Sequence, residues 1–306
     1  MTAPADLQRR PLPERSLPER PLPERPGRGA LPTRWPGGDD APAAPRPARA
    51  LVPNAALVAR HDLTGDLARF TIRPDGGVPT FHAGQYVSIG LPADTGPVLR
   101  PYSIASGPHE LDRLELLIRR LDGGALTTRL WDAPAGTRLF MGPPRGLFTL
   151  TRDDVAAAAD TGAPLLFLSA GTGLAPVMAM LRAVADAPSR PRAILIHGAA
   201  RAHELVYEEL LARWADEGWL SHRPTVSRPD APGTHGRAAW AGATGRVESH
   251  IERVLDEERV DPSAVRVYAC GNDGMVSASR EALASAGVPA TAIRFESFTP
   301  AKRQAA

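Results

Sequence analysis

The glycine turn Gly171-Thr172-Gly173 has the residue types and the setting of a phosphate-binding loop. It follows the apolar run 165–168, and the residues after it are apolar at helical spacing. A strand, a glycine turn and a helix in this order present backbone N–H groups and the positive end of a helix to a phosphate. Pro176 fits the first helical turn, where its missing N–H has no intrahelical partner. The alternative is that the glycines only let strand and helix pack closely.

A second stretch, Arg100-Pro101-Tyr102-Ser103, combines a cation, an aromatic ring and a hydroxyl. An arginine can hold a phosphate, a tyrosine can stack on a flat ring, and a serine can hydrogen-bond to that ring. Arg100 and Tyr102 share one face if this stretch is a strand. The alternatives are that Tyr102 is a core side chain and that Ser103 only satisfies a strand end.

A third stretch begins with Gly124 and continues through Leu126, Thr127 and Thr128. A glycine just before the start of a helix suits a phosphate for the same electrostatic reason as the first turn. The sequence therefore predicts a second place where a phosphate group could bind.

A fourth stretch runs from Cys270-Gly271 to Met275, at the end of a predicted strand. Open parallel sheets bind ligands at the carboxyl ends of their strands. The first glycine turn and the pair Ser227-Arg228 also follow predicted strands, so we expect all of them at one edge of a sheet. The alternative for Cys270 is an ordinary buried thiol.

Two different patterns of elements must position these stretches. Between residues 51 and 141, six short apolar runs separated by turn residues predict a small antiparallel barrel or sandwich, with one helical piece at 126–131. After residue 162, strands alternate with helices, which predicts a parallel sheet covered on both faces. The predicted barrel strands are 55–60, 67–73, 85–91, 102–105, 114–121 and 138–141. The later strands are 165–169, 193–197, 223–227, 265–270 and 293–297, and the helices are 175–185, 202–216, 247–257 and 275–286.

The fold class predicted is therefore all-β followed by α/β, a barrel and then a Rossmann-like domain. Residues 1–49 are rich in proline and arginine and repeat Leu-Pro-Glu-Arg every five residues, which predicts a disordered, extended tail. A docking arm for an acidic partner is the alternative for this tail. The predicted domains are 50–155 and 160–298, with a C-terminal tail at 299–306.

Composition excludes several classes of protein. No run of about 18 apolar residues is present, so no membrane span is expected. The single cysteine excludes an internal disulfide and a four-cysteine iron–sulfur cluster in this chain, and together these features favour the cytoplasm. The net charge of +2 gives no case for nucleic acid, and the eight histidines show no metal-ligand spacing, so no metal is predicted.

Taken in order, the four stretches resemble motifs of the ferredoxin–NADP reductase superfamily. Phe81 to Tyr86 is similar to the stretch that precedes the family's flavin motif, and 125–130 is particularly similar to the bacterial ferredoxin(flavodoxin)–NADP reductases. The resemblance covers about 51–298. It implies a barrel that binds FAD and an α/β domain that binds the pyridine nucleotide.

The resemblance also implies residue roles on the flavin side. Arg100 would hold the FAD pyrophosphate, Tyr102 would face the flavin, and Ser103 would hydrogen-bond near flavin N5. Pro101 belongs to the same motif. Phe298 could stack on the flavin, or the tail that follows it could fold over the flavin. The residues that would seat the FAD phosphates and their surroundings are Gly124, Leu126, Thr127 and Thr128.

On the nucleotide side, the resemblance places Gly171, Thr172 and Gly173 at the pyrophosphate and Cys270 beside the nicotinamide. Pro176, Gly271 and Met275 complete the predicted nucleotide site, and Glu296 would be the carboxylate near the flavin edge. Ser103, Cys270 and Glu296 are therefore the predicted catalytic residues. The alternative for Glu296 is a solvated carboxylate.

The residues favour NADP over NAD. An NAD site usually carries an acidic residue about 20 positions after the glycine turn. Arg201 follows the second strand here, as a 2′-phosphate would require, and Ser227-Arg228 is a second possible clamp. The alternative for Arg228 is a surface charge.

The sequence therefore predicts an FAD-dependent oxidoreductase that moves hydride between NADPH and FAD and single electrons to or from ferredoxin or flavodoxin. Its partner would be an acidic carrier steered by arginines, and the protein would be a monomer. One alternative is a reductase component for an oxygenase, or a flavin or quinone reductase. Another is a non-catalytic subunit that only binds FAD or a nucleotide.

Overall fold

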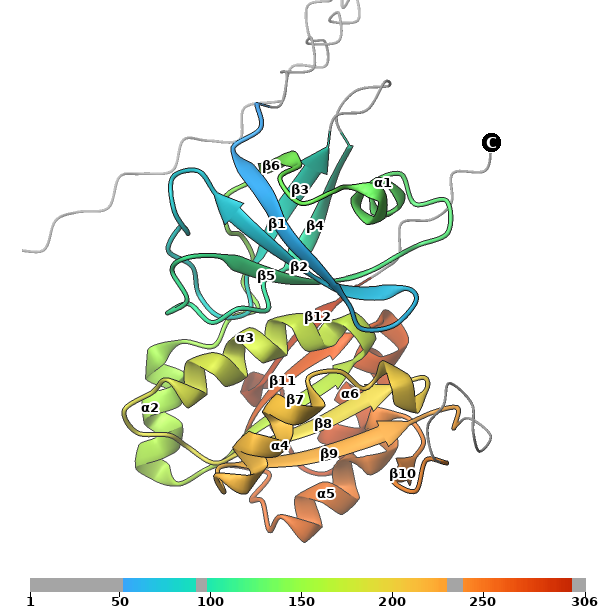
Figure 1. Cartoon of the computed structure of the whole chain (residues 1–306). Coiled ribbons are helices and arrows are strands. Elements are labelled where there is room, and N and C mark those ends of the chain that lie inside the picture. Colours follow the sequence, from blue (N-terminus) through green and yellow to red (C-terminus); the bar gives the residue numbers. More distant parts are fainter. Residues whose placement is uncertain (1–51, 92–97, 230–238, 299–306) are drawn as a thin grey trace, which may run out of the picture. The chain divides into compact units, whose positions relative to one another are not determined.

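The computed structural model describes residues 52–91, 98–229 and 239–298 (Figure 1). The predicted tails 1–49 and 299–306 lie outside these residues. Two six-stranded sheets organise the chain, one antiparallel and one parallel. The predicted fold class is confirmed.

The first sheet is built from short strands with alternating burial. Its strands are β1 (Ala55–Asp62), β2 (Leu67–Pro74), β3 (Tyr86–Leu91), β4 (Val98–Ser103), β5 (Leu114–Arg119) and β6 (Arg138–Met141). They hydrogen-bond in the order β4-β3-β6-β1-β2-β5, all antiparallel. A bridge between Ile104 and Leu116 joins the two end strands, so the sheet curls into a barrel around an apolar core. Helix α1 (Thr127–Asp132) lies between β5 and β6.

Strand β4 corrects one prediction. The sequence pattern placed a strand at 102–105, but the strand is Val98–Ser103 and pairs with β3 from Val98 to Ser103. The sequence pattern missed the first part of this strand because of Pro101. Proline has no N–H to donate to a neighbouring strand, so it argues against a central strand. β4 is an end strand, where proline is tolerated.

The second sheet is parallel, in the order β10-β9-β8-β7-β11-β12. Its strands are β7 (Leu165–Ala170), β8 (Ala193–Ala199), β9 (Leu220–Val226), β10 (Ala243–Thr244), β11 (Arg266–Gly271) and β12 (Ile293–Ser297). Helices α3 (Leu174–Ala185) and α4 (Glu208–Asp216) pack on one face, and α5 (Ile251–Glu257) and α6 (Asp273–Ser285) pack on the other. Short 3₁₀ turns lie at Gly171–Gly173, Ala202–Glu204, Val247–His250 and Ala290–Ala292. The core beneath α3 also takes in the barrel residues Leu67 and Leu117, so one apolar cluster joins the two sheets.

Helix α2 (Arg152–Thr161) occupies the predicted junction between the domains, where no helix was expected. Thr151 and Asp154 form a capping box at its start, and Gly162 ends it in the left-handed conformation at φ 69°. Asp154 is buried and binds Arg294 at 2.8 Å, which ties α2 to β12. The capping residues were visible in the sequence and are the signal that could have revealed this helix.

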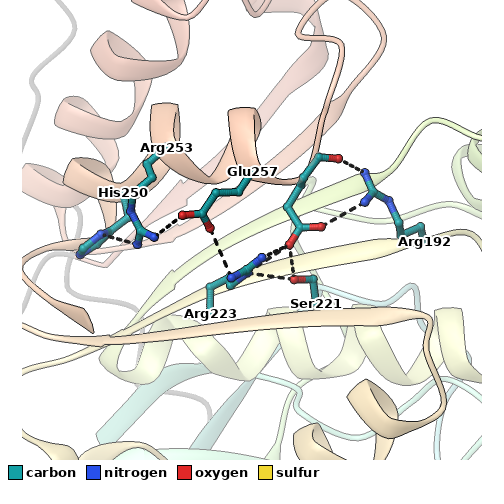
Figure 2. Close-up of polar contacts among 7 residues, drawn as sticks. Arg192, Ser221, Arg223, His250, Arg253 and Glu257 are labelled. Atoms are coloured by element: carbon teal, nitrogen blue, oxygen red, sulfur yellow. Dashed lines mark hydrogen bonds and ion pairs between the residues drawn. The ribbon is translucent and has the colours of Figure 1, made fainter. Parts of the chain in front are cut away.

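A polar network fastens α5 to the sheet on the face away from α3 (Figure 2). Arg223 on β9 reaches Glu257 and Glu258, and Arg192 binds Glu258 at 3.0 Å. Ser221 donates to Glu258 at 2.5 Å. The network is made of ion pairs and one hydroxyl, and helix α5 lies on the opposite side of the sheet from the apolar cluster shared with the barrel.

A histidine pair, one ring buried and the other half-buried, is expected to make stability depend on pH. His197 on β8 and His222 on β9 have ring centres 5.6 Å apart. Burial lowers the pKa of His197 from 6.5 to about 3, helped by the charge of His222, and burial lowers the pKa of His222 to about 4. Below pH 6.5 these two histidines therefore become protonated in the unfolded chain and stay neutral in the folded chain. The free energy of unfolding is expected to fall as the pH drops from 6.5 towards 4.

Urea unfolding at pH 7.5 and pH 5 measures this slope. In His222→Gln the loss of stability between the two pH values should be smaller than in the wild type. The exposed His61 gives a control, and His61→Gln should keep the wild-type slope. An unchanged slope in His222→Gln would show that the pair does not control the acid sensitivity.

Candidate functional site

Strand β4 presents a cation and an aromatic ring on the same face. Arg100 is exposed, and one of its N–H groups donates to the Leu99 carbonyl at 2.7 Å. Tyr102, two residues on, is half-buried and packs against the barrel core. Burial raises the pKa of Tyr102 to about 12, although the charge of Arg100 opposes the rise. A tyrosine ring and a guanidinium on one face suit a flat ring and a phosphate, and these two roles stay predictions.

Ser103 ends β4 as a buried hydroxyl without a hydrogen bond of normal geometry. Its neighbour is Glu296 on β12, whose pKa depends on burial and on the Ser103 hydroxyl. Burial raises the pKa of the Glu296 carboxyl to about 7, and Ser103 partly opposes this rise. A buried hydroxyl with spare hydrogen-bonding capacity beside a carboxyl that titrates near neutrality fits the edge of a flavin ring.

Cys270 lies beside Glu296, because the two residues are paired in the register of β11 and β12. The thiol is fully buried, and burial together with the nearby Glu296 charge raises its pKa well above the ordinary value. The thiol is therefore neutral at pH 7 and is not a nucleophile. The structure thus brings together the three predicted catalytic residues, Ser103 from the barrel and two from the parallel sheet.

The glycine turn sits directly against the end of β11. A Cβ on Gly173 would lie 2.6 Å from the carbonyl carbon of Cys270 and closer still to its oxygen, so only glycine fits there. Gly171 adopts a left-handed φ of 55°, and Thr172 is half-buried. Pro176 falls in the first turn of α3, as predicted. The start of α3 therefore points its dipole at the carboxyl edge of the sheet, beside Cys270.

The segment after β11 closes the same edge. Asn272 caps α6 by accepting from the Met275 N–H at 2.9 Å. A Cβ on Gly271 would lie 3.0 Å from the Met275 sulfur, so these residues are tightly packed. The Phe298 N–H donates to the Gly271 carbonyl at 2.8 Å, and the half-buried Phe298 ring packs on the cluster beneath α3. Phe298 thus lies at the end of β11, and its stacking on the flavin stays a prediction.

The loop before α1 is held by a hydrogen bond to the first residue of that helix, Thr127. Thr127 is buried, and its hydroxyl accepts from the Leu121 N–H at 3.2 Å. Gly124 is required because a Cβ there would lie 3.0 Å from the Leu121 carbonyl, and its own carbonyl accepts from the Thr128 N–H at 3.1 Å. Leu126 is buried in the barrel core. The hydroxyl of Thr127 therefore shapes the loop, and phosphate contacts from this loop stay a prediction.

Two arginines follow neighbouring strands at the carboxyl edge. Arg201 comes after β8, and Arg228 comes after β9. The Ser227 N–H donates to the Ala199 carbonyl at 3.0 Å, and the Arg228 N–H donates to the Ala200 carbonyl at 2.8 Å. These bonds extend the ladder past the strands and bring the two chain segments together. Arg228 is exposed, as a clamp for a ligand phosphate requires.

Sequence reasoning missed one group of polar side chains between the two sheets. The Tyr207 hydroxyl donates to Glu115 at 2.8 Å, and Arg182 binds the same carboxylate at 3.1 Å. Tyr207 and Glu115 are 92 residues apart, so no local pattern links them. Within the described ranges, no three His, Cys, Asp or Glu side chains gather so as to hold a metal ion. No helix among the same residues is both long and apolar enough to cross a membrane.

Comparison with known proteins agrees with this geometry. A family model described as oxidoreductase FAD-binding domain matches residues 54–150, and one described as oxidoreductase NAD-binding domain matches residues 167–281. Ferredoxin–NADP reductase B of Sorangium cellulosum is 36% identical over 74% of this chain and 88% of its own length. The stachydrine N-demethylase reductase subunit of Rhizobium meliloti is 28% identical, and the match covers 74% of this chain and 60% of that subunit.

Among solved structures, the Amycolatopsis cytochrome P450 reductase superposes with a TM-score of 0.68. It is 28% identical, and the match covers 81% of this chain and 70% of that one. The two matched domain models, the two sheets and the site at the carboxyl edge of the parallel sheet all support the same family. The chain belongs to the ferredoxin–NADP reductase superfamily of FAD-dependent oxidoreductases, which exchange electrons with a nicotinamide nucleotide.

Proposed function

We propose that this protein is an NADPH-dependent reductase that passes electrons to a ferredoxin or flavodoxin. The observation that carries the proposal is the convergence of Ser103, Cys270 and Glu296 at the carboxyl edge of the parallel sheet. The 36% identical ferredoxin–NADP reductase supports the choice of acceptor. In this proposal, residues 50–155 hold FAD and residues 160–298 hold NADPH.

On the barrel side, Arg100 would neutralise the FAD pyrophosphate while Tyr102 covers one face of the ring. Bound FAD would supply the redox chemistry, because a flavin accepts a hydride and releases electrons one at a time. Ser103 would donate its spare hydrogen bond to a ring nitrogen. Glu296, with a pKa of about 7, would hold or release a proton close to that nitrogen. The buried Cys270 would exclude water beside the nicotinamide.

On the nucleotide side, the N–H groups of the turn Gly171–Gly173 would bind the pyrophosphate. Arg201 and Ser227-Arg228 would bind the 2′-phosphate, since two guanidinium groups at neighbouring strand ends suit a phosphate monoester. Phe298 would stack at the flavin and shift when the nicotinamide approaches. The protein itself mainly provides positioning, because hydride transfer requires the two rings at contact distance.

The experiment is anaerobic mixing of the purified FAD-loaded protein with NADPH, followed by addition of acceptors side by side. We expect rapid bleaching of the flavin absorbance and fast reduction of ferredoxin or flavodoxin. Protein that binds FAD but stays yellow with NADPH would favour the non-catalytic alternative. Protein that binds no FAD would contradict the whole proposal.

Arg228→Ala is expected to raise the KM for NADPH about tenfold and to leave the KM for NADH within about twofold. A charge-assisted hydrogen bond contributes about 1.5–3 kcal/mol, and about 1.4 kcal/mol corresponds to tenfold in affinity. NADH lacks the 2′-phosphate and so does not use that bond. Steady-state kinetics with both nucleotides measure the difference, and Arg213→Ala on the exposed side of α4 is the control. Equal losses for the two nucleotides would contradict the clamp.

A second candidate function is a reductase component that serves an oxygenase. The relatives named as a demethylase reductase subunit and a cytochrome P450 reductase favour it. Because the chain has one cysteine, it cannot hold a four-cysteine iron–sulfur cluster, so it would need a separate carrier. The acceptor assay decides between the two candidates. A monomeric state and a cytoplasmic location stay predictions.

A further inference from the structure

The carboxylate of Glu115 joins three segments that the proposed function assigns to different ligands. Its Oε1 accepts from the Tyr207 hydroxyl at 2.8 Å and binds Arg182 at 3.1 Å, while its Oε2 faces Arg69 at 3.6 Å. The side chains of Glu115 and Arg182 are only 17% and 13% exposed, so solvent screens this group weakly. We name Glu115, Arg182 and Tyr207 the Glu115 cluster.

The first segment is the end of the flavin-side motif. The Arg182 guanidinium donates to the Ala105 carbonyl at 2.8 Å, and the Glu115 N–H donates to the Ser106 hydroxyl at 3.1 Å. Ala105 and Ser106 come directly after Ser103 and Ile104 in the chain. The cluster therefore fixes the strand end from which Ser103 reaches the site.

The second and third segments belong to the nucleotide side. Arg182 lies in the last turn of α3, whose first turn follows the glycine turn. Tyr207 ends the connection that begins at Arg201, and Glu204 in the same connection binds Arg119 of β5 at 2.6 Å. β5 thus holds this connection at two points, one at Glu115 and one at Arg119.

Tyr207 adopts a strained backbone to make these contacts. Its φ is 63°, the left-handed region that costs a tyrosine free energy. The guanidinium groups of Arg69 and Arg182 lie 5.9 and 5.8 Å from the centre of its ring. Burial, followed by the Glu115 charge, raises the pKa of its hydroxyl well above the ordinary value, so the hydroxyl stays a donor. Strain held in place by several partners is typical of a functional constraint.

We propose that the Glu115 cluster positions the flavin-side strand and the two nucleotide-binding segments relative to one another, so that hydride transfer occurs at contact distance. Glu115 and Tyr207 are then positioning residues that touch neither ligand. This inference rests on the proposed function. A small misplacement of two reacting rings slows transfer strongly, which makes the rate the sensitive quantity.

The test is stopped-flow reduction of the FAD-loaded full chain at saturating NADPH. Tyr207→Phe removes one hydroxyl and keeps the ring, and Glu115→Gln keeps the shape and removes the charge. Each is expected to slow flavin reduction about fivefold to tenfold. The dissociation constant for NADP⁺ and the FAD content per chain should stay within about twofold of the wild type.

Glu258→Gln is the matched control, because Glu258 pairs with Arg192 and Arg223 in the comparable network beside α5. It should lower the melting temperature without slowing the reduction. The proposal is overturned if both cluster variants are reduced as fast as the wild type, or if Glu258→Gln slows reduction equally. A wild-type protein that NADPH does not reduce would instead remove the proposed function, and this inference with it.

Discussion

Gly173→Ala is expected to weaken NADPH binding by about a hundredfold. The new methyl group would collide with the backbone carbonyl of Cys270, which cannot rotate away as a side chain can. The turn must then move off the end of β11. The N–H groups proposed to bind the pyrophosphate would no longer point towards it. Two charge-assisted hydrogen bonds at about 1.5 kcal/mol each account for an effect of this size. Overpacking should also lower the free energy of unfolding by about 1–3 kcal/mol.

Isothermal titration with NADPH and NADP⁺ measures the affinity, and urea unfolding measures the stability. Gly162→Ala is the matched control, because Gly162 lies outside the proposed nucleotide site. A Cβ at Gly162 has no atom within 4 Å, so that variant meets only the cost of its left-handed φ of 69° and should keep the wild-type affinity. If Gly173→Ala binds NADPH as tightly as the wild type, the turn does not hold the pyrophosphate.

Glu296→Gln is expected to slow turnover with a protein acceptor about a hundredfold at pH 7. Partial burial raises the pKa of the Glu296 carboxyl to about 7, so this group is suited to give and take a proton near neutral pH. Glutamine keeps the shape and cannot titrate. We therefore expect an inflection near pH 7 in the pH profile of wild-type turnover and its loss in the variant. A variant that keeps this inflection would assign it to another group.

The same substitution gives a second readout in stability. The folded-state pKa of Glu296 lies above the value of 4.5 for the free side chain, so the folded protein keeps a proton that the unfolded chain releases. The resulting contribution to stability is complete below pH 4.5 and is lost as the pH rises through 7. Glu296→Gln should therefore melt at a higher temperature than the wild type at pH 8 and at the same temperature at pH 4. Glu281→Gln on the exposed face of α6 should show neither effect.

Sequence patterns predicted the parts of the fold that local order dictates. The bounds of β12 were predicted as observed, β7 is one residue longer than predicted, and β11 is shifted by one residue at both ends. Because parallel strands share a carboxyl edge, the same patterns placed Gly173, Cys270 and Arg228 together. The 202–216 helix was predicted too long. Its first residues form a 3₁₀ turn, and α4 begins only after Tyr207.

What the sequence could not reveal depends on distant partners. The bridge from Ile104 to Leu116 that joins the end strands of the barrel has no local signature. The two residues of β10 form a strand only because Thr225 and Val226 lie beside them. The Glu115 cluster likewise depends on contacts between residues far apart in sequence. The raised pKa of Glu296 comes from burial, which the type and position of a residue do not disclose.

The burial of Cys270 makes this chain convenient for site-selective labelling. Its thiol is the only one in the sequence, is shielded from reagents and stays protonated at neutral pH. Maleimides should therefore leave the native protein untouched. A cysteine introduced at an exposed position such as Arg213 would then carry a single dye, spin probe or electrode tether without any background-thiol removal.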